Sequence, residues 1–297
     1  MGSAGNQGFW FTALLVATLN GAAPLLLAAM GGILSERAGV VNIALEGLIL
    51  SGAFAGAYFG QHSALIGLVA ALTVGAALGL LHAVLTQVTK MNHVVSGLGI
   101  NLLAAGATRY LTLVLFPDGI TSKSLPPAFY LASAAILPAA LAFVLRDTRF
   151  GLRLRAAGEN PESARMAGVS ILPVRLVAVT LSGICAAFAG TFLSLGETHT
   201  FSRDMSAGKG YIALAAVIFG KWNPAGAAVA SLFFGLFYAV QTQLQIRGLN
   251  INFLGVEWTS PALLDMLPYL MTLAALISVI GRATPPAALG QEEGSAH

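Results

Sequence analysis

The residues best suited to chemistry are few and scattered in this sequence. No G-x-x-x-x-G-K-[ST] phosphate loop is present, because Gly208-Lys209-Gly210 lacks both the spaced first glycine and the hydroxyl that would hold magnesium. The five histidines have no second ligand three or four positions away, so neither a metal site nor a histidine-based catalyst is indicated. We therefore expect a chain that is not an enzyme, hydrolyses no ATP and carries no cofactor.

Polar side chains within long apolar stretches are the remaining candidates, because such groups are costly in apolar surroundings and usually functional. Asn42 and Glu46 are four positions apart and share a helix face, where they either join helices or line a solute path. Asn101, in the middle of another apolar stretch, either joins two helices or faces a polar solute. Gln241 ends a third stretch, either as an interfacial cap or at a mouth of the path.

The composition indicates that the protein lies in a membrane. Of the 297 residues, 57% are hydrophobic and only 9% are charged, whereas a soluble domain carries roughly a quarter of its residues as charged side chains. Because so few charged side chains cannot cover the surface of a soluble fold, the surface of this protein must be covered by lipid. The net charge of +3 forms no basic face for nucleic acid, because six of the fifteen basic residues lie between Arg146 and Arg175.

Eight stretches reach the length of about 20 apolar residues that a membrane-spanning helix needs. A shorter apolar piece, 210–220, is followed by Lys221-Trp222-Asn223-Pro224, a pattern typical of a broken or re-entrant helix beside a cavity. The sequence thus predicts an all-α, polytopic helical bundle, with one transmembrane domain over 1–282 and a disordered tail over 283–297. The eight predicted spans are 9–34, 40–60, 63–89, 92–116, 124–145, 175–196, 222–246 and 262–281.

The distribution of Lys and Arg predicts the orientation, because short basic loops remain in the cytoplasm. The Arg146–Arg175 loop is therefore expected to be cytoplasmic, and the N-terminus to lie outside. The C-terminus lies inside if 210–220 crosses the membrane and outside if it is re-entrant. Because Arg282 directly follows the last span, we favour the inside.

The basic loop contains start and stop signals for a short helix. Asn160 is a good N-cap, Pro161 suits the first helical position, and Gly168 is placed to end the helix. Ala164 and Ala167 would form a small-residue face, from which Arg165 projects. These signals indicate a docking element for a cytosolic partner.

Three motifs resemble the permease subunits of bacterial ABC importers in the branched-chain amino acid/ribose/nucleoside superfamily. The first, in Gly32–Phe54, has the S-E-R-x-G-x-x-N-I-x-x-E-G pattern of the nucleoside-type branch. The second, in Gly158–Val169, has the G-x-N-P-x-x-A-x-x-x-G-V pattern of the coupling helix that docks on the ATPase. The third, Gly208–Ala227, is similar to the broken-helix segment of the same branch.

This resemblance implies a multi-pass permease of the bacterial cytoplasmic (inner) membrane that imports purine nucleosides or related nucleobases. Its implied partners are membrane lipid, a second homologous permease subunit, a cytosolic ATP-binding subunit that holds the ATP, and an extracytoplasmic substrate-binding protein. The residues implied to couple to the ATPase are Gly158, Glu159, Asn160, Pro161, Ala164, Arg165, Ala167 and Gly168.

Other functions remain open from the residues alone. A permease for a simple sugar such as ribose, or for another small polar solute, has the same architecture, and no residue here separates ribose from nucleoside by direct argument. An ion-coupled secondary transporter would need intramembrane acids, and Glu46 with Asp265 makes a poor set. A membrane enzyme would need paired acids, a Ser/His set or a metal box, none of which is visible.

Overall fold

The computed structural model describes residues 3–116, 119–247, 252–253, 256–257, 266, 270, 273 and 283–291. Helices dominate these residues, and the few strands are two residues long. The helices are α1 (Ser3–Arg37), α2 (Leu45–Gly60), α3 (Ala64–Gln87), α4 (His93–Leu115), α5 (Pro127–Asp147), α6 (Arg149–Glu159), α7 (Pro161–Met166), α8 (Ile171–Thr191), η1 (a π-helix, Phe192–Glu197), α9 (Lys209–Phe219) and α10 (Pro224–Arg247). The strands are β1 (Ile120–Thr121), β2 (Thr200–Phe201), β3 (Asn252–Phe253) and β4 (Val256–Glu257).

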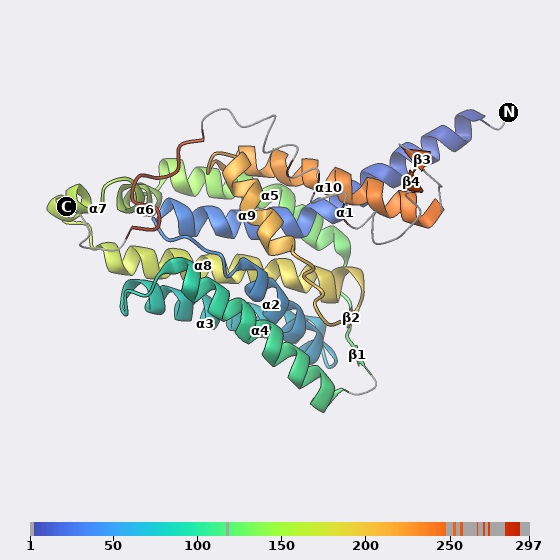
Figure 1. Cartoon of the computed structure of the whole chain (residues 1–297), viewed down its shortest axis with the longest axis horizontal. Helices are drawn as coiled ribbons and strands as arrows, with labels where there is room; N and C mark the ends of the chain where they lie inside the picture. Colours follow the sequence, from blue (N-terminus) through green and yellow to red (C-terminus); the bar gives the residue numbers. More distant parts are fainter. Residues whose placement is uncertain are drawn as a thin grey trace.

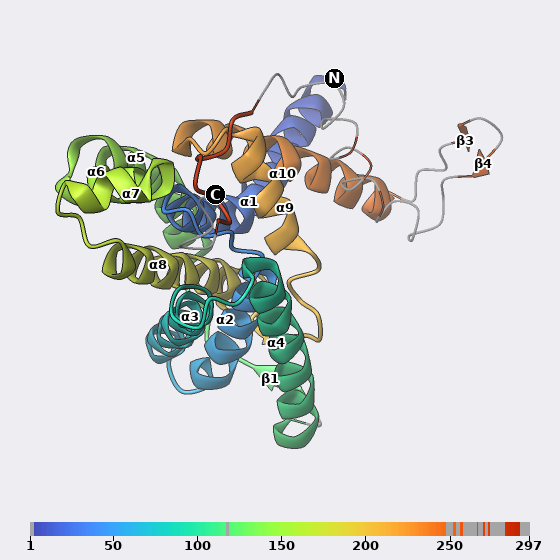
Figure 2. The ribbon, with the colours of Figure 1, turned by 60° about the vertical axis from the view of Figure 1, so that its left-hand side comes forward.

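Helix α8 is the centre of the bundle. It packs against α3 and α2 on one side and against α1 on the other, while α9 and α10 pack on α1 (Figures 1 and 2). Glycine allows the closest of these contacts, because a Cβ on Gly75 of α3 would collide with the carbonyl of Gly183 on α8. The small residues of the sequence thus bring helix backbones together, as expected for a membrane bundle.

Six helical segments are long and apolar enough to cross a membrane in the part of the chain that the structure describes. They confirm a multi-pass bundle, but not the predicted count of eight. These segments are Trp10–Arg37, Ala64–Gln87, His93–Leu115, Pro127–Asp147, Ile171–Glu197 and Pro224–Ile246. The predicted span 262–281 lies outside the described residues except for three positions.

The prediction of a long span over 40–60 is wrong, because the helix in this region begins only at Leu45 and has 16 residues. Residues 38–44 form turns instead, with Gly39 at a φ of +92°. The Ser35 hydroxyl donates to the Val40 carbonyl at 2.7 Å, so a side chain satisfies part of the unwound backbone. Length and hydropathy could not reveal this unwinding, because the unwound residues are themselves apolar.

Helix α9 has 11 residues and ends at a sharp elbow before α10. Lys221 and Trp222 at the elbow both adopt a φ of +53°, in the left-handed region that non-glycine residues rarely occupy. The amide of Trp222 donates to the Val217 carbonyl at 3.0 Å, which satisfies a carbonyl in the last turn of α9. The expected interruption between 210–220 and the following span is therefore an elbow between two helices.

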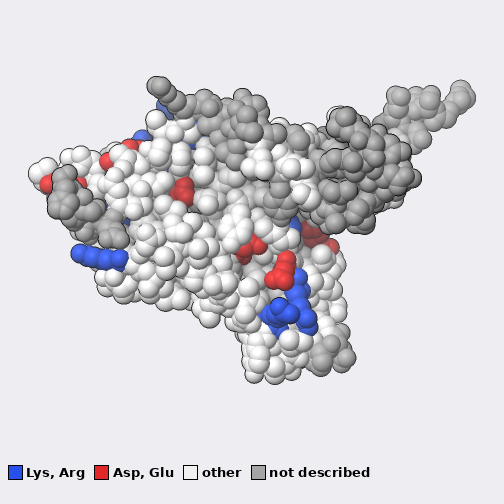
Figure 3. Space-filling view, viewed as in Figure 1, with Lys and Arg blue, Asp and Glu red and all other residues white. Residues whose placement is uncertain are grey.

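The two ends of the bundle are closed differently. At one end, β1 pairs antiparallel with β2, which joins the segments after α4 and η1. The opposite end carries α6 and α7, the predicted cytoplasmic loop, and is called the inner end here (Figure 1). Most of the described surface between the two ends is uncharged in Figure 3, as a lipid-facing surface requires.

Residues 283–291 form a clasp at the inner end, although they belong to the tail that we expected to be disordered. The amide of Ala288 donates to the Gly158 carbonyl at 2.8 Å, and that of Gly290 donates to the Gly39 carbonyl at 3.0 Å. Ala288 is buried. The clasp therefore joins the end of α6 to the turn after α1.

Candidate functional site

The N-termini of the two short helices meet at a junction made by Glu46. This residue lies in the first turn of α2, and its carboxylate accepts hydrogen bonds from the amides of Gly208 and Gly210 at 2.8 and 2.7 Å. Amides at a helix N-terminus have no partner within the helix and carry partial positive charge, so a carboxylate stabilises them. A Cβ on Gly210 would overlap the backbone of Glu46. Glycine at this position therefore permits the junction.

Asn101 supports the same junction from α4. Its side-chain oxygen accepts from the amide of Gly47 at 2.8 Å, while its nitrogen donates to the Ile43 carbonyl at 2.9 Å and the Tyr211 hydroxyl at 3.1 Å. The side chain thereby ties α4 to the start of α2 and to α9. Of the two roles open for Asn101 from the sequence, joining helices accounts for all three of these contacts.

Asn42 lies in the non-helical segment before α2. Its side-chain nitrogen donates to the Ser182 hydroxyl of α8 at 2.8 Å, and its side-chain oxygen is buried without a hydrogen-bond partner in the described structure. The sequence placed Asn42 and Glu46 on one helix face. The structure separates them, because residues 38–44 are not helical.

A cavity of about 390 Å³ lies next to the junction, between α1, α9 and α10. Its size is within the range of small-molecule pockets, roughly 300–1,000 Å³. Gln241 lines it, so the structure places this predicted path residue at a cavity. The other polar lining residues are Lys209, Tyr238, Thr242 and Gln245.

Lys209 is the functional candidate that our sequence analysis missed. Its ammonium nitrogen lies 5.4 Å from the centroid of the Tyr238 ring, at a distance typical of a cation–π contact. In the sequence, Lys209 stands out only within Gly208-Lys209-Gly210, which does not match a phosphate loop. Its position as a cation next to the apolar run of α9 was the signal that could have identified it.

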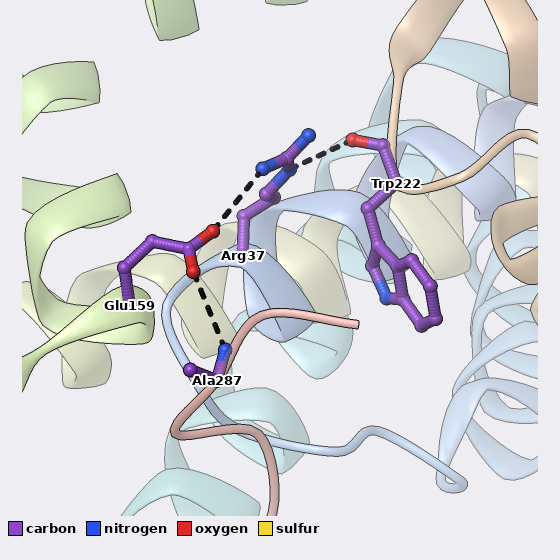
Figure 4. Close-up of polar contacts among 4 residues, drawn as sticks. All are labelled: Arg37, Glu159, Trp222 and Ala287. Carbon is purple, nitrogen blue, oxygen red and sulfur yellow. Dashed lines mark hydrogen bonds and ion pairs between the residues drawn. The ribbon is translucent and has the colours of Figure 1, made fainter. Parts of the chain in front are cut away.

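At the inner end, Arg37 joins three parts of the chain (Figure 4). Its guanidinium lies 3.6 Å from the Glu159 carboxylate and donates from Nε to the Trp222 carbonyl at 2.9 Å. Glu159 also accepts from the amide of Ala287 at 3.4 Å. The ends of α1 and α6, the elbow and the clasp therefore meet around one ion pair.

Arg175, which the sequence analysis treated only as part of the basic loop, is buried at the start of α8. It donates to the Ala38 carbonyl at 3.0 Å, the Gln87 side chain at 2.9 Å and the Ala157 carbonyl at 3.3 Å. These acceptors belong to the turn after α1, the end of α3 and α6. Arg175 thus holds together the elements on which α6 and α7 rest.

The predicted start and stop signals of the loop helix operate as expected. The Asn160 side chain accepts from the amide of Ser163 at 2.9 Å, Pro161 begins α7, and Gly168 follows the helix with a φ of +80°. The side-chain cap and the fixed φ of proline both favour a helix start here. Helix α7 has six residues and is therefore a short helix, as predicted.

The faces of α6 and α7 differ from those expected. Ala164 is buried in a cluster with Ala157 and Ile171, whereas Ala167 is exposed, so the two alanines do not form one outward face. Gly158 is also buried, and a Cβ there would overlap the Arg37 carbonyl. The exposed residues of these two helices are Arg149, Leu152, Arg153, Glu159, Glu162, Ser163, Arg165 and Met166.

No group of three or more His, Cys, Asp or Glu side chains that could hold a metal ion is found among the described residues. The lining of the cavity instead combines one ammonium, two amides, two hydroxyls and aromatic rings. This chemistry suits hydrogen bonding to a polar organic molecule.

Comparison with known proteins identifies related sequences. Residues 14–276 match the family described as branched-chain amino acid transport system / permease component. The chain is 36% identical to the guanosine ABC transporter permease protein NupQ of Bacillus subtilis, over 93% of this chain and 95% of the relative. It is 35% identical to the nucleoside ABC transporter permease protein NupC of Lactococcus lactis, over 90% and 92% of the two chains.

A relative named for another solute is nearly as similar. The putative glucose ABC transporter permease protein TsgC13 of Haloferax volcanii is 34% identical, over 89% of this chain and 90% of the relative. No solved structure matches the chain.

Proposed function

Because this chain belongs to the family of branched-chain amino acid transport permease components, we propose that it is the membrane subunit of a nucleoside importer. One observation carries the choice of solute: relatives named for guanosine and for nucleosides align over nine-tenths of both chains at 35–36% identity. As a permease it is a multi-pass membrane protein and not an enzyme. The family places it in the bacterial inner membrane, with an ATPase and a substrate-binding protein as partners.

The second candidate solute is a sugar, and TsgC13 is the observation that favours it. The cavity supports a nucleoside better, because it combines aromatic rings with amides. A flat base can lie against the rings of Tyr238 and Phe234, while Gln241 and Gln245 reach its polar edge. A sugar ring can present only its C–H groups to these rings, whereas a base also presents a flat π-face.

We propose that the solute path passes between α1, α9 and α10, beside the junction made by Glu46. The cavity lies there, and the short helices α2 and α9 both begin there. Broken helices within a membrane bundle typically form binding sites, because their free ends carry partial charges and their backbone is covered by protein. Glu46 and Asn101 then shape the path, and Gln241 contacts the solute.

The clasp supports a C-terminus on the inner side. Residues 283–291 contact Gly39 and Gly158 at the inner end, whereas α10 begins at that end and runs away from it (Figure 1). The chain must therefore return to the inner end after α10. We propose that residues 198–208 run from the end opposite the inner end into the bundle, as far as the junction. Helix α9 then continues to the inner end, so that 210–220 is part of a segment that crosses the membrane.

We propose that α6 and α7 couple the permease to its ATPase. Their outward face carries apolar side chains flanked by charges, and Met166 is 79% exposed and Leu152 61%. Such a protruding apolar group on a rigid support suits insertion into a groove of a partner protein. The buried residues Gly158 and Ala164 hold the element in place, and Asn160 and Pro161 fix its start.

Uptake measurements test the proposed solute. The chain, its ATPase, its binding protein and any second permease are expressed in a strain that lacks nucleoside and sugar uptake. We expect uptake of labelled guanosine that requires this chain. Uptake of glucose or ribose without nucleosides would overturn the choice of solute in favour of the second candidate.

A further inference from the structure

We propose that Lys209 reads the edge of a purine base in the cavity between α1, α9 and α10, and that it selects 6-oxopurine nucleosides over 6-aminopurine nucleosides. This inference rests on the proposed function and assigns a specificity-determining residue to it.

The backbone around Lys209 is fixed, so its side chain enters the cavity from a defined point. Both neighbouring amides, of Gly208 and Gly210, are held by the Glu46 carboxylate. The amide of Lys209 donates to the Ser206 carbonyl at 2.9 Å, and Gly208 has a φ of +78° that ends the preceding loop. Only the side chain remains to act on a solute.

The neighbours of Lys209 leave its hydrogen-bond donors usable. The carboxylates of Glu46 and Glu197 attract the ammonium electrostatically, although neither lies within ion-pair distance in the described structure. The Tyr238 ring lies against it at 5.4 Å. A π-face stabilises a cation without accepting a conventional hydrogen bond. The three N–H donors of an ammonium can therefore serve a ligand.

Helix α10 presents the opposite wall of the cavity. Tyr238, Gln241 and Gln245 follow one another at spacings of three and four residues, so they share one face of the helix. Leu25, Ile212 and Phe234 supply the apolar part of the lining. A flat molecule with apolar faces and a polar edge fits this arrangement, and a purine base is such a molecule.

The hydrogen-bond donors of Lys209 then discriminate between purines. An ammonium has donors only, so it pairs with acceptor atoms. A 6-oxopurine presents two adjacent acceptors, O6 and N7, whereas a 6-aminopurine presents N7 beside the donor N6–H₂. The second pattern places a donor against a donor. Lys209 therefore favours guanosine and inosine over adenosine.

The test compares uptake of guanosine and adenosine by the complete importer in a strain without other nucleoside transport. We expect K209M to lower guanosine uptake about tenfold and to remove the preference for guanosine, while K209R keeps the preference. K90M is the matched control, because Lys90 is an exposed lysine outside the cavity, in the turn between α3 and α4. Membrane levels of all variants are measured by immunoblot.

An unchanged ratio of guanosine to adenosine uptake in K209M would overturn the proposal, because Lys209 would then act only on structure. A wild-type importer that takes up both purines equally would also overturn it and leave the proposed function intact. If the wild-type importer takes up no nucleoside, the proposed function itself is wrong.

A second measurement covers the case in which K209M fails to insert. Thr242 lines the cavity, and T242C in a C185S background gives one thiol there. We expect guanosine to slow maleimide labelling of this thiol in the complete importer. Labelling at the same rate with and without guanosine would show that no nucleoside occupies the cavity.

Discussion

The guanidinium of Arg37 and the carboxylate of Glu159 lie 3.6 Å apart and link the inner ends of α1 and α6. Both side chains are partly exposed, at 26% and 53%. A pair this exposed contributes roughly 0.2–1 kcal/mol to stability. The pair therefore contributes more to the position of α6 than to the stability of the fold.

Removal of each partner of this pair should have a different effect. E159Q breaks the ion pair alone, so we expect a loss of less than about 1 kcal/mol in stability. R37A also leaves the Trp222 carbonyl without its side-chain donor, which adds a cost of about 1 kcal/mol or more. Thermal unfolding of the purified importer in detergent measures both. Equal losses in the two variants would contradict a separate role for the contact with Trp222.

Glu46 should be sensitive even to replacement by its amide. E46Q keeps the shape of the side chain but removes the charge that faces the N-terminus of α9. Charge-assisted hydrogen bonds contribute about 1.5–3 kcal/mol each, so we expect a clear fall in thermal stability and in uptake. Normal uptake by E46Q would show that the junction needs no charge.

Asn101 should behave as a structural residue. N101L removes the partners of the Gly47 amide and the Ile43 carbonyl. A buried polar group left unsatisfied costs about 1–3 kcal/mol, so we expect lower membrane levels as well as lower uptake. Normal levels with lost uptake in N101L would instead indicate contact with the solute.

The two faces of α7 should separate docking from folding. M166E changes an exposed side chain, so we expect normal levels in the membrane but reduced uptake and reduced solute-stimulated ATP hydrolysis. A164E buries a charge against Ala157 and Ile171, so we expect loss of the folded loop itself. Limited proteolysis of the loop distinguishes these results. If M166E transports normally, the outward face of α7 does not dock on the ATPase.

The asparagine cap allows a smaller test. N160A removes the hydrogen bond to the Ser163 amide, and loss of an N-cap costs about 1 kcal/mol. We expect partial loss of coupling, measured as the ratio of ATP hydrolysed to solute imported. N160S, which can still cap, should restore the ratio to near the wild-type value.

The sequence allowed the multi-pass fold and the cap of α7 to be predicted, because both depend on local pattern. Asn160, Pro161 and Gly168 are close together in the chain, so their signals could be interpreted directly. The unwound turn after Arg37 could not be predicted from hydropathy, which is the same for helical and unwound apolar residues. Its stability depends on Arg175, which is 137 residues away from Ala38.

The candidate site could likewise be predicted only where its residues form a local pattern. The sequence shows Gln241 as a polar residue at the end of an apolar stretch, and this residue lines the cavity. Its contact with a solute stays a prediction. Glu46 and Asn101 were noticed for the same reason, but their partners are distant in sequence. The bond from Glu46 to Gly208 spans 162 residues, so no spacing pattern could have indicated it.

The clasp also has a consequence for biosynthesis. Ala288 is synthesised 130 residues after the Gly158 carbonyl that it binds. At translation rates of about 5–20 residues per second, roughly 6 to 26 seconds pass before this carbonyl receives its partner. During that interval, Gly39 and Gly158 expose backbone acceptors at the surface where the ATPase is proposed to dock. A nascent chain thus differs from a finished one at this surface, and an importer could be assembled preferentially from finished chains.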